Sequence, residues 1–141
     1  MSIMTDNLPT PEHELLPIHE LKKLSLPEML NALPRIGIQE GWVLRARMPT
    51  IICVDGTRLS VQAGRHLCCT PRADRGPYTH VEVGFPSKRP PSHWKEYCED
   101  WEHPTETVYA YVPIEDVLFF IGSCGGMDRD KTFANFRYSV W

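Results

Sequence analysis

The chain is 141 residues long, with 42% hydrophobic residues, 23% charged residues and a formal net charge of −3. This composition is ordinary for a globular domain with one core, and it excludes a whole-protein basic field of the kind that drives nucleic-acid binding. The charge is unevenly divided, because residues 45–89 carry eight Lys/Arg against three Asp/Glu and residues 90–126 carry one against seven.

No stretch of the sequence approaches the roughly 18 apolar residues that a membrane helix needs. The segment Met1–Asp6 contains no basic region followed by an apolar one. We therefore expect a cytoplasmic protein with no membrane partner. The five cysteines are odd in number and irregularly spaced, which favours reduced thiols over a disulfide framework.

Residues 1–24 predict a loose N-terminal segment. Thr10-Pro11-Glu12 has the form of a helix start, Pro17 interrupts the pattern, and a weakly amphipathic piece continues from Ile18 to Leu24. The next helix is predicted over residues 25–33, because Ser25-Leu-Pro-Glu28 has the form of a capping box. Its apolar residues recur at helical spacing before Pro34: Leu26, Met29, Leu30 and Leu33.

Residues 42–48 predict a strand, and residues 50–63 predict a β-hairpin, because Asp55-Gly56 between two β-branched runs favours a two-residue turn. The register of such a hairpin places three pairs on the core side: Val54 with Thr57, Ile52 with Leu59 and Thr50 with Val61. The opposite face then holds the remaining residues: Ile51, Cys53, Arg58, Ser60 and Gln62.

A turn-rich loop over residues 64–77 leads to a third alternating run, residues 78–85. One side of this run holds Thr79, Val81, Val83 and Phe85, and the other holds Tyr78, His80 and Glu82. Because a rigid sheet would position the loop, and loops of that kind commonly carry function, the loop is the first place to look for a site.

The C-terminal half predicts a short helix over residues 92–100, with Trp94 and Tyr97 inward, and a strand over residues 105–112. One face of that strand holds Val108, Ala110 and Val112, and the other holds Thr107, Tyr109 and Tyr111. Pro113 then opens a helix that Gly125-Gly126 ends; its apolar stripe is Ile114, Val117, Leu118 and Ile121. The tail from Met127 either adds a strand or remains exposed.

These elements together predict an α+β fold: a small antiparallel sheet of four or five strands, with two or three helices packed mainly on one face. The expected organisation is a loose segment over 1–24, a single α+β domain over 25–126 and a C-terminal tail over 127–141.

Several short stretches from Ser60 onward carry a resemblance, and they cover about half of the chain: Ser60-Val-Gln-Ala63, Cys69-Thr-Pro-Arg72, Gly76-Pro-Tyr78, Val81-Glu-Val-Gly-Phe-Pro-Ser87, Glu99-Asp100, Pro104-Thr105, Thr107-Val-Tyr109, Tyr111-Val-Pro113 and Gly125-Gly126. The sequence resembles small uncharacterised proteins encoded by bacteriophages and prophages. That resemblance implies an accessory phage protein, a class that includes non-catalytic inhibitors of bacterial defences such as anti-CRISPR proteins.

The candidate binding residues lie in or next to the 64–77 loop: Arg65, Arg72, Arg75, Tyr78 and His80. Arginine and tyrosine dominate interface hot spots, so this set favours a binding surface over an active site. No Gly-rich phosphate loop, nucleophile elbow or His-Glu-x-x-His pattern is present. We therefore expect a non-catalytic protein, without cofactor or metal, that binds a host protein and inhibits it, a CRISPR or other defence component being one such target.

Two alternatives stay open. The first alternative is a small metalloprotein, whose metal ligands would come from His66-x-Cys68-Cys69 or from Cys98-x4-His103. It could equally be a thiol enzyme, in which nearby arginines or His80 activate Cys69. The second alternative is a weak nucleic-acid-binding module that uses the basic segment over residues 45–89, although the net charge of the chain does not favour it.

Overall fold

The main sheet has four antiparallel strands in the order β3-β4-β5-β6. They are β3 (Ile51–Ile52), β4 (Arg58–Gln62), β5 (His80–Gly84) and β6 (Val108–Pro113). The computed structural model describes residues 16–33, 37–39, 42–45, 47–134, 136 and 139–140. The expectations for Thr10–Glu12 and for the rest of residues 1–15 lie outside these described residues.

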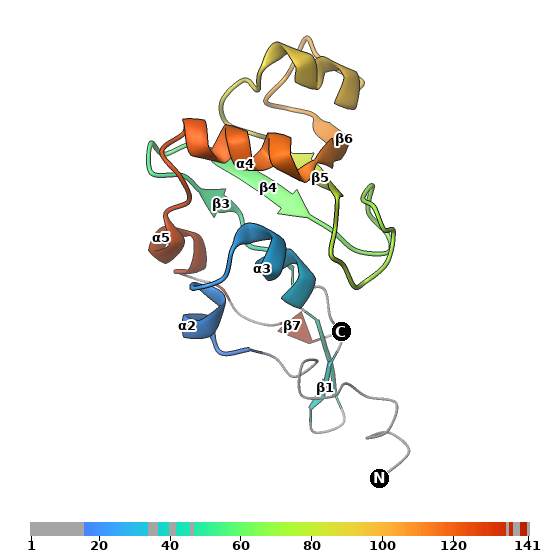
Figure 1. Ribbon diagram of the computed structural model, residues 1–141, viewed down its shortest axis with the longest axis vertical. Helices are drawn as coiled ribbons and strands as arrows, with labels where there is room; N and C mark the ends of the chain where they lie inside the picture. Colours follow the sequence, from blue (N-terminus) through green and yellow to red (C-terminus); the bar gives the residue numbers. More distant parts are fainter. Residues whose placement is uncertain are drawn as a thin grey trace.

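A second, three-stranded antiparallel sheet has the order β1-β2-β7. It consists of β1 (Gly37–Gln39), β2 (Trp42–Arg45) and β7 (Ser139–Val140). The strand expected over residues 42–48 therefore exists as β2, but it pairs with β1 and with the C-terminal β7 rather than with the main sheet (Figure 1).

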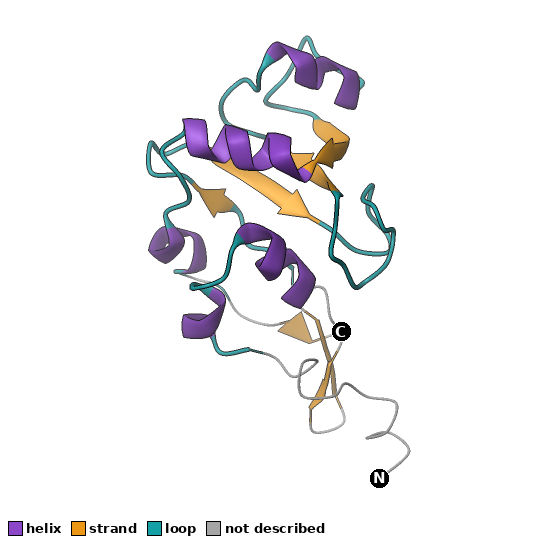
Figure 2. Cartoon of the chain, in the orientation of Figure 1, coloured by secondary structure: helices purple, strands orange, loops and turns teal. Residues whose placement is uncertain are grey.

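The helices are α2 (Ile18–Leu21), α3 (Leu26–Ala32), the 3₁₀ helix η2 (Ser92–Tyr97), α4 (Ile114–Ser123) and α5 (Arg129–Phe133). Helix α4 crosses the front of the main sheet in the view of Figure 1, whereas η2 lies beyond β6 at one end (Figures 1 and 2). The predicted α+β fold is confirmed. None of the helices within the described ranges is both long and apolar enough to cross a membrane.

Helix α3 begins where the capping box predicts. The Ser25 hydroxyl accepts a hydrogen bond from the Glu28 backbone N–H, and the Glu28 carboxylate accepts one from the Ser25 backbone N–H. These bonds satisfy two donors that a helix start leaves without partners. The predicted apolar face is buried in the core: Leu26, Met29, Leu30 and Leu33.

The predicted register of the β3–β4 hairpin is wrong by one residue. Ile51 lies opposite Leu59, and the Cys53 N–H donates to the Thr57 carbonyl, so the loop has three residues rather than two. Gly56 takes a positive φ of 93°, as the last residue of such a loop does. Because side chains alternate along a strand, the slip reverses the predicted faces of the first strand only: Ile51 and Cys53 are buried, and Val54 is exposed. On the second strand, Thr57, Leu59 and Val61 are buried as predicted.

The predicted alternation in β6 is also wrong. Val81 pairs with Val112 and Val83 pairs with Tyr109, so an extra residue of β6 forms a bulge between the two pairs. Tyr111, in the bulge, has a φ of 52°. The bulge shifts the inward positions to Tyr109 and Val112, while Val108 and Tyr111 are exposed.

Three smaller expectations differ as well. Phe85, expected on the same side as Val81 and Val83, is 59% exposed and has a φ of 50°. Phe120 replaces Leu118 in the buried stripe of α4. The charged stretch after Met127 forms α5, because the Asp128 carboxylate accepts a hydrogen bond from the Lys131 N–H and caps the helix.

Candidate functional site

The segment between β4 and β5, residues 64–79, is called the binding loop here because it holds most of the candidate binding residues. Its base is fixed to the start of β5. The Thr70 N–H donates to the His80 carbonyl at 3.0 Å, and the Thr79 N–H donates to the Thr70 carbonyl at 2.8 Å. These bonds hold the two ends of residues 71–78 side by side, so this stretch forms a compact loop.

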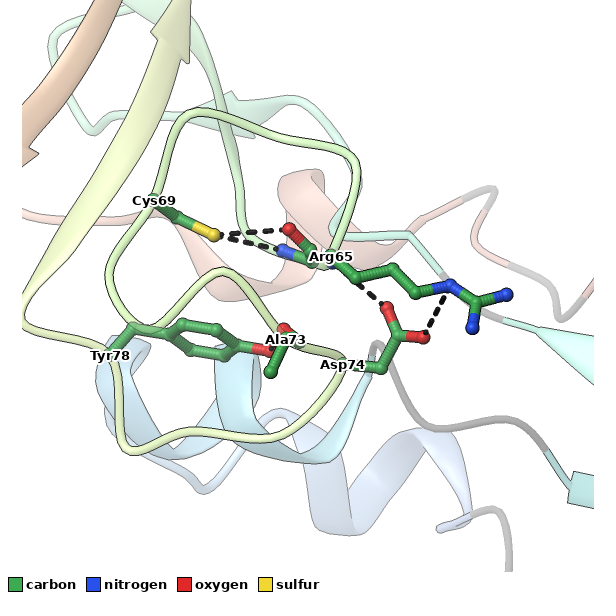
Figure 3. A network of polar contacts seen from close by, with 6 residues as sticks. Arg65, Cys69, Ala73, Asp74 and Tyr78 are labelled. Carbon is green, nitrogen blue, oxygen red and sulfur yellow. Dashed lines mark hydrogen bonds and ion pairs between the residues drawn. The ribbon is translucent and has the colours of Figure 1, made fainter.

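Cys69 organises the first half of the loop from the inside (Figure 3). Its side chain is buried, and its sulfur lies 3.3 Å from the Gly64 nitrogen, 3.1 Å from the Gly64 oxygen and 3.3 Å from the Pro71 oxygen. Burial raises the pKa of this thiol, and the opposing effect of backbone hydrogen bonds and of Arg72 is smaller. A thiol held in its protonated form is a poor nucleophile, so the geometry suits a structural role for Cys69.

Tyr78 organises the second half. Its ring is 5% exposed, and its hydroxyl donates to the Ala73 carbonyl at 2.7 Å (Figure 3). The sequence places Tyr78 among the candidate contact residues, but its ring lies inside the loop. Its role is to support the turn from beneath, and a partner at the surface would not reach most of it.

Arg65 joins the two halves of the loop. Its backbone N–H donates to one carboxylate oxygen of Asp74 at 3.1 Å, and its Nε lies 3.3 Å from the other oxygen. The ion pair is partly exposed, so it contributes modestly to stability. Arg65 is therefore engaged within the loop and is less available to a partner than an unpaired arginine.

The loop is also tied to helix α3. The Gly76 N–H donates to the Asn31 side-chain oxygen at 2.7 Å. A side chain at position 76 would place its Cβ 2.6 Å from the Tyr78 nitrogen and 2.8 Å from the Tyr78 ring, closer than real Cβ atoms approach. Position 76 thus requires glycine, because the chain folds directly against the tyrosine that supports it.

Arg72 and Arg75 are exposed on this braced loop. Neither side chain forms a hydrogen bond or an ion pair with another residue in the described ranges. His80 is half-buried at the base, where its Nδ1 lies 2.9 Å from the Thr79 hydroxyl. Two of the five candidate residues thus carry exposed charges that are not paired with any residue in the described part of the chain.

Tyr111 extends this surface, although the sequence gives no signal for it. Its backbone N–H donates to the Cys68 carbonyl at 3.1 Å, and the neighbouring Cys68 N–H donates to the Glu82 carboxylate at 3.2 Å. The Tyr111 ring is 43% exposed. The bulge in β6 therefore places an exposed aromatic residue where the strand meets the binding loop.

The Cys/His alternatives find no assembled site in the part of the chain that the structure describes, where no group of three His, Cys, Asp or Glu side chains could hold a metal ion. His103 Nδ1 instead pairs with the Asp100 carboxylate at 3.0 Å. The Cys98 sulfur contacts the Lys95 carbonyl at 3.8 Å.

In comparisons with known proteins, no family model, no curated protein and no solved structure matches the chain.

Proposed function

We propose that this chain is a non-catalytic binding protein that uses the binding loop to bind a protein partner and inhibit it. The observation that carries the proposal is the contrast within the loop. Arg72 and Arg75 are exposed and form no hydrogen bond or ion pair with the described residues, while the backbone beneath them is fixed by Cys69, Tyr78 and the Asn31–Gly76 hydrogen bond.

The energetics of binding favour this arrangement. A partner that docks on a flexible loop must order it, which costs about 0.5–1.5 kcal/mol for each side chain immobilised, in addition to the backbone cost. A loop that is already ordered by its own hydrogen bonds avoids the backbone part of that cost. The guanidinium group of each arginine then forms two parallel hydrogen bonds with a carboxylate of the partner.

The partner class follows from the resemblance to phage accessory proteins. We infer a bacterial host protein in the cytoplasm, a defence component such as a CRISPR protein being the kind of target that the resemblance implies. An acidic surface on that partner would complement the exposed charges of Arg72 and Arg75.

The test is a pull-down from a bacterial lysate, followed by affinity measurement on the recovered partner. The variant Arg72→Ala/Arg75→Ala should change the free energy of unfolding by less than about 0.5 kcal/mol, because both residues are exposed. Affinity should fall by about thirtyfold or more, which corresponds to about 2 kcal/mol of lost binding energy.

A matched control removes the same charge elsewhere. Arg58 and Lys88 are exposed outside the loop, so Arg58→Ala/Lys88→Ala should retain nearly full affinity. Val83→Ala in the core should lower the melting temperature and reduce binding only by reducing the folded fraction. Equal losses in the two charge variants would identify a nonspecific electrostatic effect, and parental affinity of the loop variant would refute the proposed site.

The nucleic-acid alternative predicts a different result. Binding through the basic segment would give a mobility shift with oligonucleotides, and its affinity would fall steeply as the salt concentration rises. Such a shift, without a stoichiometric protein partner from the lysate, would replace the proposed function.

A further inference from the structure

Two buried cysteines that are far apart in the sequence are brought together at the end of the β3–β4 hairpin. Cys53 follows β3, and Cys124 caps the C-terminus of α4. Each is 1% exposed. Burial raises the pKa of the Cys53 thiol, and the nearby Cys124 thiol adds to that rise.

The backbone around the two cysteines holds them in this position. The Asp55 N–H donates to the Cys124 carbonyl at 3.1 Å, and the Val54 N–H donates to the Gly126 carbonyl at 2.9 Å. Cys53 also pairs with Met127 in an antiparallel bridge. Because the backbone bonds involve three positions of the C-terminal segment, Cys124, Gly126 and Met127, the main chains of the two cysteines are held close together.

The turn beside the thiols is shaped for this contact. Gly125 has a φ of 90°, and a side chain there would place its Cβ 3.1 Å from the Cβ of Val54. The two glycines after α4 thus let the hairpin tip approach the helix end closely. The thiols lie just beneath that tip, where Val54 is 63% exposed.

We propose that Cys53 and Cys124 are a dithiol pair that forms an intrachain disulfide by exchange with a low-molecular-weight disulfide. The thiolate of one cysteine attacks a sulfur of the external disulfide and releases one small thiolate. The second cysteine then attacks the mixed disulfide and releases the other. The chain loses two electrons and two protons, and one external disulfide is reduced to two thiols.

The environment also determines when this exchange occurs. Burial, the charge of Cys124 and the charge of Asp55 raise the pKa of the Cys53 thiol to about 12, so the reactive thiolate is rare while the hairpin is closed. Exchange therefore requires the hairpin tip to separate from the end of α4. The pair remains reduced in a reducing compartment and becomes cross-linked where the external disulfide dominates.

The experiment uses oxidised glutathione as the probe. The full-length protein is refolded from denaturant in buffers of rising oxidised-to-reduced glutathione ratio, the free thiols are alkylated, and peptides are mapped by mass spectrometry. We expect a dominant Cys53–Cys124 linkage, a mass lower by two hydrogen atoms, and a melting temperature raised by about 10 °C, since the disulfide closes a long loop.

The controls separate this pair from the other thiols. Cys68→Ser/Cys98→Ser removes the half-buried cysteines and should keep both the linkage and the shift in melting temperature. Cys124→Ala should abolish both. The mapping of the unmodified chain decides the question without any variant: free Cys53 and Cys124 at the highest ratio, or a mixture of pairings with Cys68, Cys69 and Cys98, would overturn the proposal.

Discussion

The binding loop and the aromatic cluster around η2 are both held by internal contacts, but the contacts are of different kinds. The aromatic cluster consists of Trp94, Tyr97, Tyr109 and Phe120, whose rings meet edge-on or tilted with centroids 5.4–6.1 Å apart. It depends on apolar burial, whereas the loop depends on hydrogen bonds. The cluster therefore supplies stability and the loop supplies shape, so mutations should separate the two.

Trp94→Ala should produce the largest effect. The side chain is fully buried, and truncation of a buried aromatic residue costs about 3–5 kcal/mol. Urea unfolding followed by circular dichroism measures the loss. Trp94→Phe should cost roughly half as much, because it keeps a ring and because the indole N–H has no hydrogen-bond partner among the described residues. A small effect of Trp94→Ala would show that the cluster is peripheral.

Gly76→Ala should have the next largest effect, and it acts on the loop. The new Cβ would collide with the Tyr78 backbone and ring, so we expect a loss of about 2 kcal/mol and a large drop in partner affinity in the fraction that stays folded. Gly122→Ala in α4 is the matched control. It has open space around its Cβ and should stabilise the helix by about 0.5–1 kcal/mol. Full partner affinity of Gly76→Ala would show that the loop shape does not matter for binding.

The two regions contain a matched pair of tyrosines. Tyr78 in the loop donates to the Ala73 carbonyl at 2.7 Å, and Tyr109 in the cluster donates to the Pro104 carbonyl at 2.6 Å. Both spacings are five residues, so Tyr78→Phe and Tyr109→Phe should each cost about 1 kcal/mol in denaturant unfolding. Only Tyr78→Phe should weaken partner binding. If Tyr109→Phe weakens it equally, binding follows global stability rather than loop shape.

The elements that the sequence predicts well are those defined by local chemistry. The capping box at Ser25, the turn-rich loop before β5 and the diglycine after α4 each act within a few residues, so they can be found without knowledge of the fold. The exposed positions of Arg72 and Arg75 follow from the same logic, because charged residues in turn-rich segments remain solvated.

The errors come from contacts between distant segments. The β3–β4 loop has three residues because Val54 and Asp55 bond to Gly126 and Cys124, which no local pattern around Asp55-Gly56 reveals. The bulge in β6 is tied to Cys68, more than forty positions earlier in the sequence. The inward position of Tyr78 depends likewise on the path of the whole loop, so it could not be predicted from the sequence alone.

The smallest expected effect concerns Tyr97, where the cluster meets solvent. Burial raises the pKa of Tyr97 to about 12, and the hydroxyl's hydrogen bond to Asp116, at 2.7 Å, adds to the shift. Burial also raises the pKa of Tyr109 to about 12. An unfolded tyrosine titrates near pH 10, so the folded state binds more protons between pH 10 and 12. The stability from both groups is therefore complete below pH 10 and is lost as the pH rises through 12.

Tyr97→Phe tests that assignment. Because Tyr97 is partly exposed and Asp116 keeps its contact with His93 at 3.2 Å, the variant should lose well under about 1 kcal/mol at pH 7. Between pH 10 and 12 its free energy of unfolding should fall less steeply than that of the parent, because the variant lacks the Tyr97 phenol, whose pKa is raised in the folded state. Urea titrations across this range measure the two slopes. Identical slopes for Tyr97→Phe and the parent would mean that the Tyr97 hydroxyl is solvated rather than bound to Asp116.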